Sequence, residues 1–215
     1  MDLKKIGLSL AIALPLILKG ACPQASELTD KYVHALEQND FISMTKIIED
    51  NKDKLPGEVK SLLEEAKQPG ISPEDRDAKF YQAELMAKAY KDATNEVGPL
   101  KEVKMKAFDA KLAPATRPAA DNGVYMIELP KPTGDVKNVF KPENIVIKKG
   151  ETVKWVNKDD TPHIFATMPV ISAASFNSKS VEPNGTFEYK FEKPGEYFYL
   201  CFIHHAMIGK ITVEE

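Results

Sequence analysis

The sequence predicts a two-domain protein, with an all-α helical domain followed by an all-β Greek-key sandwich or barrel. Three observations lead to this fold class. Up to about Leu112, apolar residues recur at intervals of three and four, as on one face of a helix. Residues 113–123 contain two prolines, four alanines and a closing Asn-Gly, which is typical of a linker. From Val124 onward, short β-branched and aromatic runs are separated by turn residues.

Residues 1–21 have the features of a secretory signal peptide. Two lysines precede an uncharged apolar run over 6–18, and this run is shorter than the roughly 20 residues that span a bilayer. Cys22 follows Gly-Ala, as at the end of a bacterial lipoprotein signal, although Lys19 departs from that pattern. We therefore expect an exported protein on the periplasmic or extracellular face of the membrane. Lipid attachment at Cys22 is one prediction, and an uncleaved anchor or ordinary cleavage nearby is the alternative.

The composition is that of an ordinary globular protein, with 43% hydrophobic and 28% charged residues. It indicates neither a disordered chain nor a membrane bundle. The formal net charge of −3 gives no electrostatic reason to expect nucleic-acid binding. The sequence has no Cys-x-x-Cys-His motif, which excludes a covalently attached c-type haem.

The helical domain is predicted over residues 26–112, and its role is open between a spacer, a docking domain and an oligomerisation unit. Proline and glycine separate its segments, and Ser72-Pro73 provides an N-cap hydroxyl followed by proline at the first helical position. The apolar stripe of the longest segment predicts a bundle core, whereas its charged residues are expected mostly elsewhere. The predicted helices cover 26–38, 40–53, 56–68, 73–95 and 99–112.

The β domain is predicted over residues 124–215. Many short strands in so few residues indicate an antiparallel sandwich or barrel. The predicted strands cover 124–129, 144–148, 151–157, 186–191 and 196–200, with a further alternating run at 209–213. The expected core comprises Ile145, Ile147, Val153, Trp155, Phe187, Phe191, Tyr197 and Tyr199.

A cluster of metal-binding side chains lies near the C-terminus. Cys201, His204 and Met207 follow one another at intervals of three and supply the soft and borderline donors that copper and zinc prefer. A fourth donor must come from elsewhere, and His163, which follows the predicted strand of Trp155, is the other histidine of this domain outside the loop. Two imidazoles, a thiolate and a thioether form the ligand set of a mononuclear electron-transfer copper centre.

With these donors, residues 124–215 resemble a cupredoxin of the plastocyanin/amicyanin family of blue copper proteins. The short ligand loop is most similar to that of amicyanin. The resemblance implies that His163, Cys201 and His204 are equatorial ligands of one type 1 copper ion and that Met207 is the axial ligand. The motifs that carry it are Phe140-x-Pro142, Gly150-x-Thr-Val-x-Trp-x-Asn157, Asp160-x-x-His163, Pro194-Gly-x-Tyr-x-Tyr-x-Cys201 and His204-x-x-Met207-x-Gly209.

Two positions depart from the family pattern. Ile164 stands where many members have an asparagine whose amide helps to join the two ligand loops. His205 stands where the amicyanin-like loop has a proline, so two neighbouring imidazoles compete for one ligand position. The loop spacing favours His204, and His205 is the alternative ligand.

The resemblance implies an exported electron carrier, not an enzyme, that docks transient redox partners at an apolar surface near His204. Residues 168–171 are expected to enlarge that surface. A copper-binding or delivery module without redox traffic is the alternative. A copper enzyme is disfavoured because it needs a second copper site, and the chain has only four histidines and no His-x-His pair. A structural zinc site is disfavoured because methionine is a poor zinc ligand.

Overall fold

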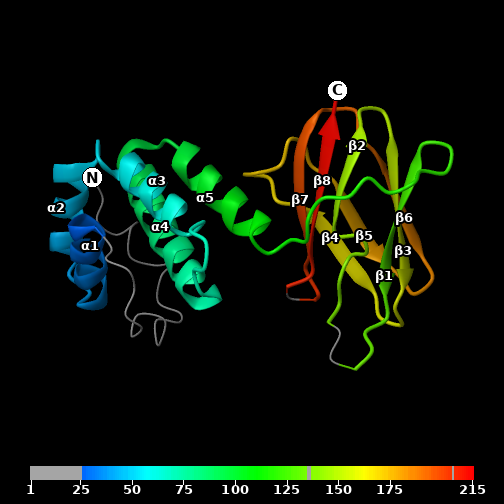
Figure 1. Cartoon of the computed structure of the whole chain (residues 1–215), viewed down its shortest axis with the longest axis horizontal. Helices are drawn as coiled ribbons and strands as arrows, with labels where there is room; N and C mark the ends of the chain where they lie inside the picture. The colour runs from blue at the N-terminus through cyan, green and yellow to red at the C-terminus, as the bar shows by residue number, and fades with distance from the viewer. Residues whose placement is uncertain (1–25, 135–136, 205) are drawn as a thin grey trace. The chain divides into compact units, whose positions relative to one another are not determined.

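A computed structural model describes residues 26–134, 137–204 and 206–215 (Figure 1). The predicted signal over 1–21 and the predicted lipid attachment at Cys22 lie outside the described residues, so both stay predictions. The chain divides into two compact units, one ending at Val103 and the other beginning at Lys104. No helix in the described ranges is long and apolar enough to cross a membrane.

The N-terminal unit is helical, and all five predicted helices are present with ends shifted by at most a few residues. The second half of the fifth helix, from Lys104 onward, belongs to the C-terminal unit. Side-chain caps fix three of the starts. Ser26 accepts a hydrogen bond from the Thr29 amide, Asp40 from the Ser43 amide, and Ser72 from the Asp75 amide. The helices are α1 (Glu27–Glu37), α2 (Phe41–Asn51), α3 (Leu55–Glu65), α4 (Pro73–Thr94) and α5 (Gly98–Asp109).

The apolar stripe of α4 forms part of the core of this unit, as predicted. Phe80, Leu85 and Met86 are buried. Lys79 was expected among the charged residues away from the core, and this expectation is wrong. Its side chain is fully buried, and its ammonium group lies 2.6 Å from a carboxylate oxygen of Glu65 on α3. A buried lysine requires such a partner because an unpaired charge would lose its hydration without compensation.

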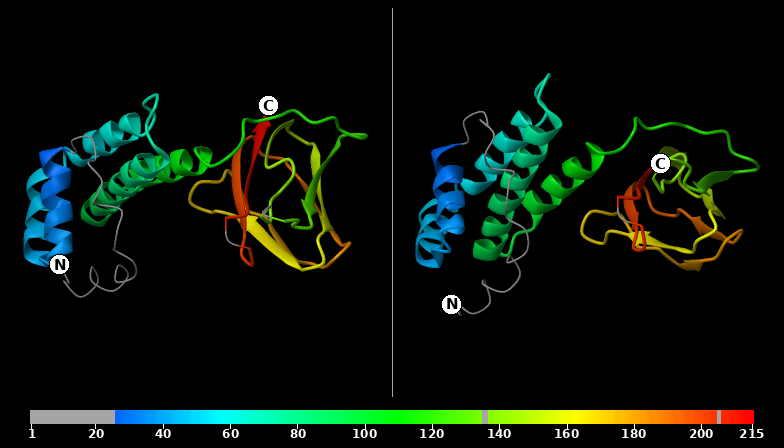
Figure 2. Two further views of the ribbon diagram at one scale, coloured as in Figure 1. Left: turned by 60° about the horizontal axis from the view of Figure 1, so that its bottom comes forward. Right: turned by 90° about the horizontal axis from the view of Figure 1, so that it is seen from below.

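The C-terminal unit contains two sheets that face each other (Figure 2). One has the strand order β1-β3-β6 and the other the order β2-β8-β7-β4-β5, and they do not close into one continuous barrel sheet. The strands are β1 (Val124–Pro130), β2 (Asn144–Lys148), β3 (Thr152–Lys158), β4 (His163–Thr167), β5 (Asn177–Val181), β6 (Thr186–Lys190), β7 (Gly195–Cys201) and β8 (Ile208–Glu214).

The expectation of a purely antiparallel arrangement is wrong for two strand pairs. β1 pairs with β3, and β2 pairs with β8, in parallel. Both pairs arise because the chain passes to the opposite sheet before it returns, so the paired strands are not joined by a hairpin. β4 and β5 were not predicted as strands.

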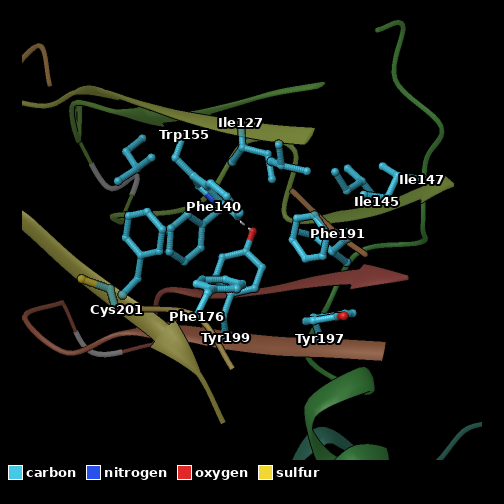
Figure 3. Packing of buried hydrophobic residues seen from close by; sticks show 14 of the residues in the cluster. Ile127, Phe140, Ile145, Ile147, Trp155, Phe176, Phe191, Tyr197, Tyr199 and Cys201 are labelled. Atoms are coloured by element: carbon cyan, nitrogen blue, oxygen red, sulfur yellow. Dashed lines mark hydrogen bonds between the residues drawn. The ribbon is translucent and has the colours of Figure 1, made fainter. Parts of the chain in front are cut away.

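The core between the two sheets contains every residue predicted for it (Figure 3). Phe187 is only partly buried, whereas the other seven are buried. Trp155 is fully buried, and its indole N–H donates a 3.5 Å hydrogen bond to the Tyr199 hydroxyl. Cys201 lies at one end of this aromatic cluster (Figure 3). The sandwich core therefore reaches to the thiol of the predicted metal site.

The segment that precedes the first strand also contacts the sandwich. Thr116, within the predicted linker, accepts a 2.9 Å backbone hydrogen bond from Val146 and donates a 3.0 Å bond to Asn144. Arg117 forms a 2.6 Å ion pair with Glu214 at the end of β8. These contacts attach the first half of the linker to the edge strand β2 and the neighbouring strand β8.

Candidate metal centre

Two neighbouring strands and one loop bring the predicted donors together. His163 is the first residue of β4 and Cys201 is the last residue of β7. These strands are antiparallel neighbours, with Phe165 opposite Cys201, so the start of β4 and the end of β7 lie side by side at one end of the sheet. His204 lies in the loop from β7 to β8, and Met207 immediately precedes β8. The fold thereby joins a histidine and a cysteine that are far apart in the sequence.

The donor atoms form a compact triangle. Cys201 Sγ lies 3.8 Å from Nδ1 of His163 and 3.7 Å from Nδ1 of His204, and the two nitrogens are 3.1 Å apart. The centre of such a triangle is about 2.1 Å from each atom, within the roughly 2.0–2.3 Å of zinc bonds to imidazole and thiolate. Among the described residues, these three form a group that could hold a metal ion. The residues present therefore fit a transition-metal ion with soft donors.

The two histidines differ in their surroundings. His163 is fully buried, whereas His204 is partly exposed. Burial lowers the pKa of His163, and the nearby His204 lowers it further, while the hydrogen bond with Asp159 acts in the opposite direction. Because the lowered pKa keeps the ring neutral, a nitrogen lone pair is available to a metal ion.

A buried carboxylate holds the far side of the His163 ring. Oδ2 of Asp159 lies 3.2 Å from Nε2 of His163 and accepts hydrogen bonds from Thr161 and Asn138. Burial opposes ionisation of Asp159, but hydrogen bonds from Thr161, the Asp160 amide and His163 lower its pKa to about 2. The carboxylate is therefore ionised at neutral pH.

Asp159 was missed by the sequence reasoning, which singled out Asp160 in the Asp160-x-x-His163 motif. In the structure, Asp160 is exposed and pairs with Lys131 at 2.6 Å, and Asp159 makes the contact with the histidine. The available signal was the presence of two acids, at three and four residues before a candidate ligand, in a short loop. Sequence alone did not show which of the two faces inward.

The loops that carry the donors are joined by main-chain hydrogen bonds. The Phe202 amide donates to the Ile164 carbonyl at 2.8 Å, next to both ligand strands. The Cys201 amide donates to the Met207 carbonyl at 3.0 Å, which closes the loop between β7 and β8. The two ligand loops are therefore tied together although Ile164 has no side-chain amide.

Met207 and the two other histidines have different outcomes. Met207 is buried and packs in the sandwich core, and its role as axial ligand stays a prediction. His205 lies outside the described residues, so its competition with His204 also stays open. His34, the remaining histidine, is exposed on α1 in the other unit.

The surface beside the donor loop is apolar. Phe202 is 61% exposed and Ile203 is 43% exposed, and both directly precede His204. The expectation that the whole segment 168–171 enlarges this surface is wrong for Ile171, which is buried. Ile171 packs with Phe108 and Phe198 in a separate cluster, with partly buried Met168 against it. Val170 remains exposed.

Comparisons with known proteins match the C-terminal unit. A family model described as copper binding proteins of the plastocyanin/azurin family matches residues 131–214. Plastocyanin of Scenedesmus fuscus is 39% identical over 85 residues, which cover 35% of this chain and 87% of that protein. Amicyanin-alpha of Methylorubrum extorquens is 34% identical over 80 residues, which cover 36% of this chain and 66% of that protein.

One solved structure with a similar segment is a purple cupredoxin from Nitrosopumilus maritimus. It is 32% identical and aligns with a TM-score of 0.37, covering 41% of this chain and 98% of that chain.

Proposed function

This chain belongs to the plastocyanin/azurin family of copper-binding proteins, and we propose that it carries single electrons between redox partners. One copper ion would be held by His163, Cys201, His204 and Met207. The observation that carries the proposal is the triangle of one sulfur and two imidazole nitrogens at the end of the sandwich core.

The residues support this function through their chemistry and their rigidity. Copper bound there supplies a one-electron Cu(II)/Cu(I) couple. Cys201 and His163 sit at the ends of hydrogen-bonded strands, and both side chains are shielded from water. Because the fold fixes these donors, they have little freedom to rearrange when the charge of the centre changes. Small rearrangement favours fast electron transfer.

The exposed edge of His204 supports a docking site for transient redox partners. Its ring is partly accessible, and Phe202 and Ile203 present apolar side chains beside it. A small apolar surface suits a brief encounter, because short-lived redox complexes bury little area. We propose that partners dock at this surface, close to His204, which is partly exposed, whereas the other histidine of the donor triangle is buried.

We extend the proposal to an exported protein attached to the membrane surface through lipid at Cys22. The support is the signal-like run before Cys22, and ordinary cleavage nearby is the competing outcome. The mass of the mature N-terminus tests the attachment. An unmodified cysteine at that position would contradict it.

Copper addition to the purified protein tests the main proposal. We expect intense visible absorption from a copper–thiolate bond and a reversible one-electron potential. His204→Ala should abolish the absorption, whereas His205→Ala and the matched control His34→Ala should retain it. A colourless Cu(II) adduct of the unaltered protein would contradict an electron-transfer centre of this type.

A copper-delivery module is the competing function, and the accessibility of His204 favours it as a second candidate. An exposed ligand gives a partner protein a route to take over the ion itself. Delivery predicts rapid loss of copper to a competing chelator together with no reversible potential. Slow loss with a reversible potential would favour electron transport.

A further inference from the structure

We propose that Asp159 is a positioning residue that directs Nδ1 of His163 to the metal and favours the oxidised state of the centre. The proposal rests on the proposed copper function. It concerns the protein side of the site and can also be tested on the metal-free chain.

The contact between Asp159 and His163 fixes the position of the ring proton. Both side-chain oxygens of Asp159 already accept hydrogen bonds from other donors, so this group acts as an acceptor and its 3.2 Å contact requires a proton on Nε2 of His163. A neutral imidazole carries one proton, and Nδ1 therefore keeps its lone pair. Nδ1 is also the atom that faces Cys201 Sγ at 3.8 Å. The carboxylate selects the tautomer that the donor triangle needs.

The carboxylate is itself held in place by three further donors. Oδ2 accepts from the Thr161 hydroxyl at 2.6 Å and from the Asn138 amide at 3.0 Å, and Oδ1 accepts from the Asp160 backbone at 2.7 Å. With these bonds made, Asp159 cannot turn away from His163 without leaving several donors unpaired.

The loop behind the carboxylate is anchored by Asn157, which is fully buried. Its side-chain oxygen accepts from the Asp159 amide at 2.9 Å. Its side-chain nitrogen lies 2.9 Å from the carbonyls of both Thr161 and Val181 and donates to each. The network connects the end of β3 to β5 and to the loop that leads into β4. The direction of the His163 ring is thereby set by the fold before any ion binds.

The charge of Asp159 has a predictable effect on the redox balance. The carboxylate is buried, so solvent and salt screen it less than a surface charge. A nearby negative charge stabilises the more highly charged metal ion, and a hydrogen bond from the imidazole to a carboxylate makes the ring a stronger donor. Both effects favour Cu(II) and lower the reduction potential.

Asp159→Asn tests the inference, and Asp160→Asn is the matched control. Both substitutions remove one negative charge from adjacent positions, but Asp160 is exposed and pairs with Lys131 instead of the histidine. We expect Asp159→Asn to shift the ratio of Cu(I) to Cu(II) affinity about tenfold towards Cu(I), which raises a one-electron potential by about 59 mV. For Asp160→Asn we expect this affinity ratio to change about twofold or less, because solvent and salt screen the exposed charge. Equal shifts in the two variants would overturn the proposal.

Nitrogen NMR of the metal-free protein provides a second test that does not depend on copper. We expect His163 of the unaltered chain to be a single tautomer with its proton on Nε2, and Asp159→Asn to give a mixture. A proton on Nδ1 in the unaltered chain would overturn the inference even if Asp159→Asn failed to fold. Loss of the reversible potential with the expected tautomer intact would reject the proposed function and leave the positioning role supported.

Discussion

Both faces of the five-stranded sheet carry packed side chains, but different parts of the chain pack against them. On the inner face, Tyr199 and Cys201 of β7 pack in the core that leads to the metal donors. On the outer face, Phe198 of the same strand packs edge-on against Phe108 of α5, with ring centroids 5.2 Å apart. Alternation along one strand therefore separates the residues that build the site from those that hold the last turn of a helix.

The outer face also carries a charged contact. Lys210 of β8 lies 2.8 Å from Asp109 at the end of α5 and 2.5 Å from Glu196 of β7. Its ammonium group stands 4.8 Å above the Phe198 ring. We therefore expect the inner face to control copper chemistry and the outer face to control only the stability of the unit.

Removal of the thiol should have the largest effect. Cys201→Ser replaces the soft donor of the inner face with a hydroxyl, so we expect complete loss of the copper–thiolate absorption. Absorption spectroscopy during copper titration measures this, with the outer-face variant Lys210→Met as the control. Retention of the absorption by Cys201→Ser, or its loss in Lys210→Met, would contradict the division between the faces.

A methyl group on the inner face of β8 should destabilise the sandwich. A Cβ atom added at Gly209 would overlap the buried ring and hydroxyl of Tyr199, so Gly209→Ala forces the core to shift. We expect a loss of about 3 kcal/mol in the free energy of unfolding, at the upper end of the usual range for overpacking. Trp155 is the only tryptophan, so its fluorescence during denaturation reports this unit alone. An unchanged denaturation midpoint would show that Tyr199 has room to move.

Sequence reasoning predicted the inner face well. Alternation identified the core residues, and the spacing of Cys201, His204 and Met207, with His163, identified the candidate donors that the fold brings into one region. β4 and β5 could not be predicted as strands because they are short and have atypical sequences. β4 begins at a donor histidine, and β5 is polar, with Lys179 at a positive φ of 53°. Such residues form strands through their neighbours in the sheet and not through their own propensity.

The outer face could not be predicted in the same way. The run from Tyr197 to Leu200 is continuously apolar, and this pattern indicates a strand that is covered on both faces. This pattern does not identify the segment that packs on the outer face, since the sequence at Phe108 and Asp109 resembles an ordinary helix end. Asp159 was missed for a related reason. Burial of one of two adjacent acids depends on tertiary contacts that local patterns do not contain.

Truncation of the aromatic contact on the outer face should have a moderate effect on stability. Phe108→Ala removes the ring that packs on Phe198 and Ile171. We expect a loss of about 2 kcal/mol, less than for a phenylalanine in a full core, because this cluster is small. Denaturation followed by Trp155 fluorescence measures it. The copper–thiolate absorption should be unchanged, and a shifted band would show that the outer face influences the donors.

Loss of the Lys210 ion pairs at high pH should have the smallest effect on the free energy of unfolding. Burial alone would lower the pKa of Lys210, but the hydrogen bonds to Asp109 and Glu196 raise it above its ordinary value of 10.5. A raised pKa in the folded state means that the stabilisation is complete below pH 10.5 and is lost as the pH rises through the folded value.

Denaturation of the unaltered protein and of Lys210→Met across this pH range tests the prediction. The unaltered protein should lose on the order of 1 kcal/mol relative to the variant as the ammonium group deprotonates. The subtraction removes the contribution of other lysines, because both proteins share them. Parallel stability curves through the alkaline range would show that these ion pairs contribute nothing, leaving Phe108 and its apolar neighbours to hold the helix end on the outer face.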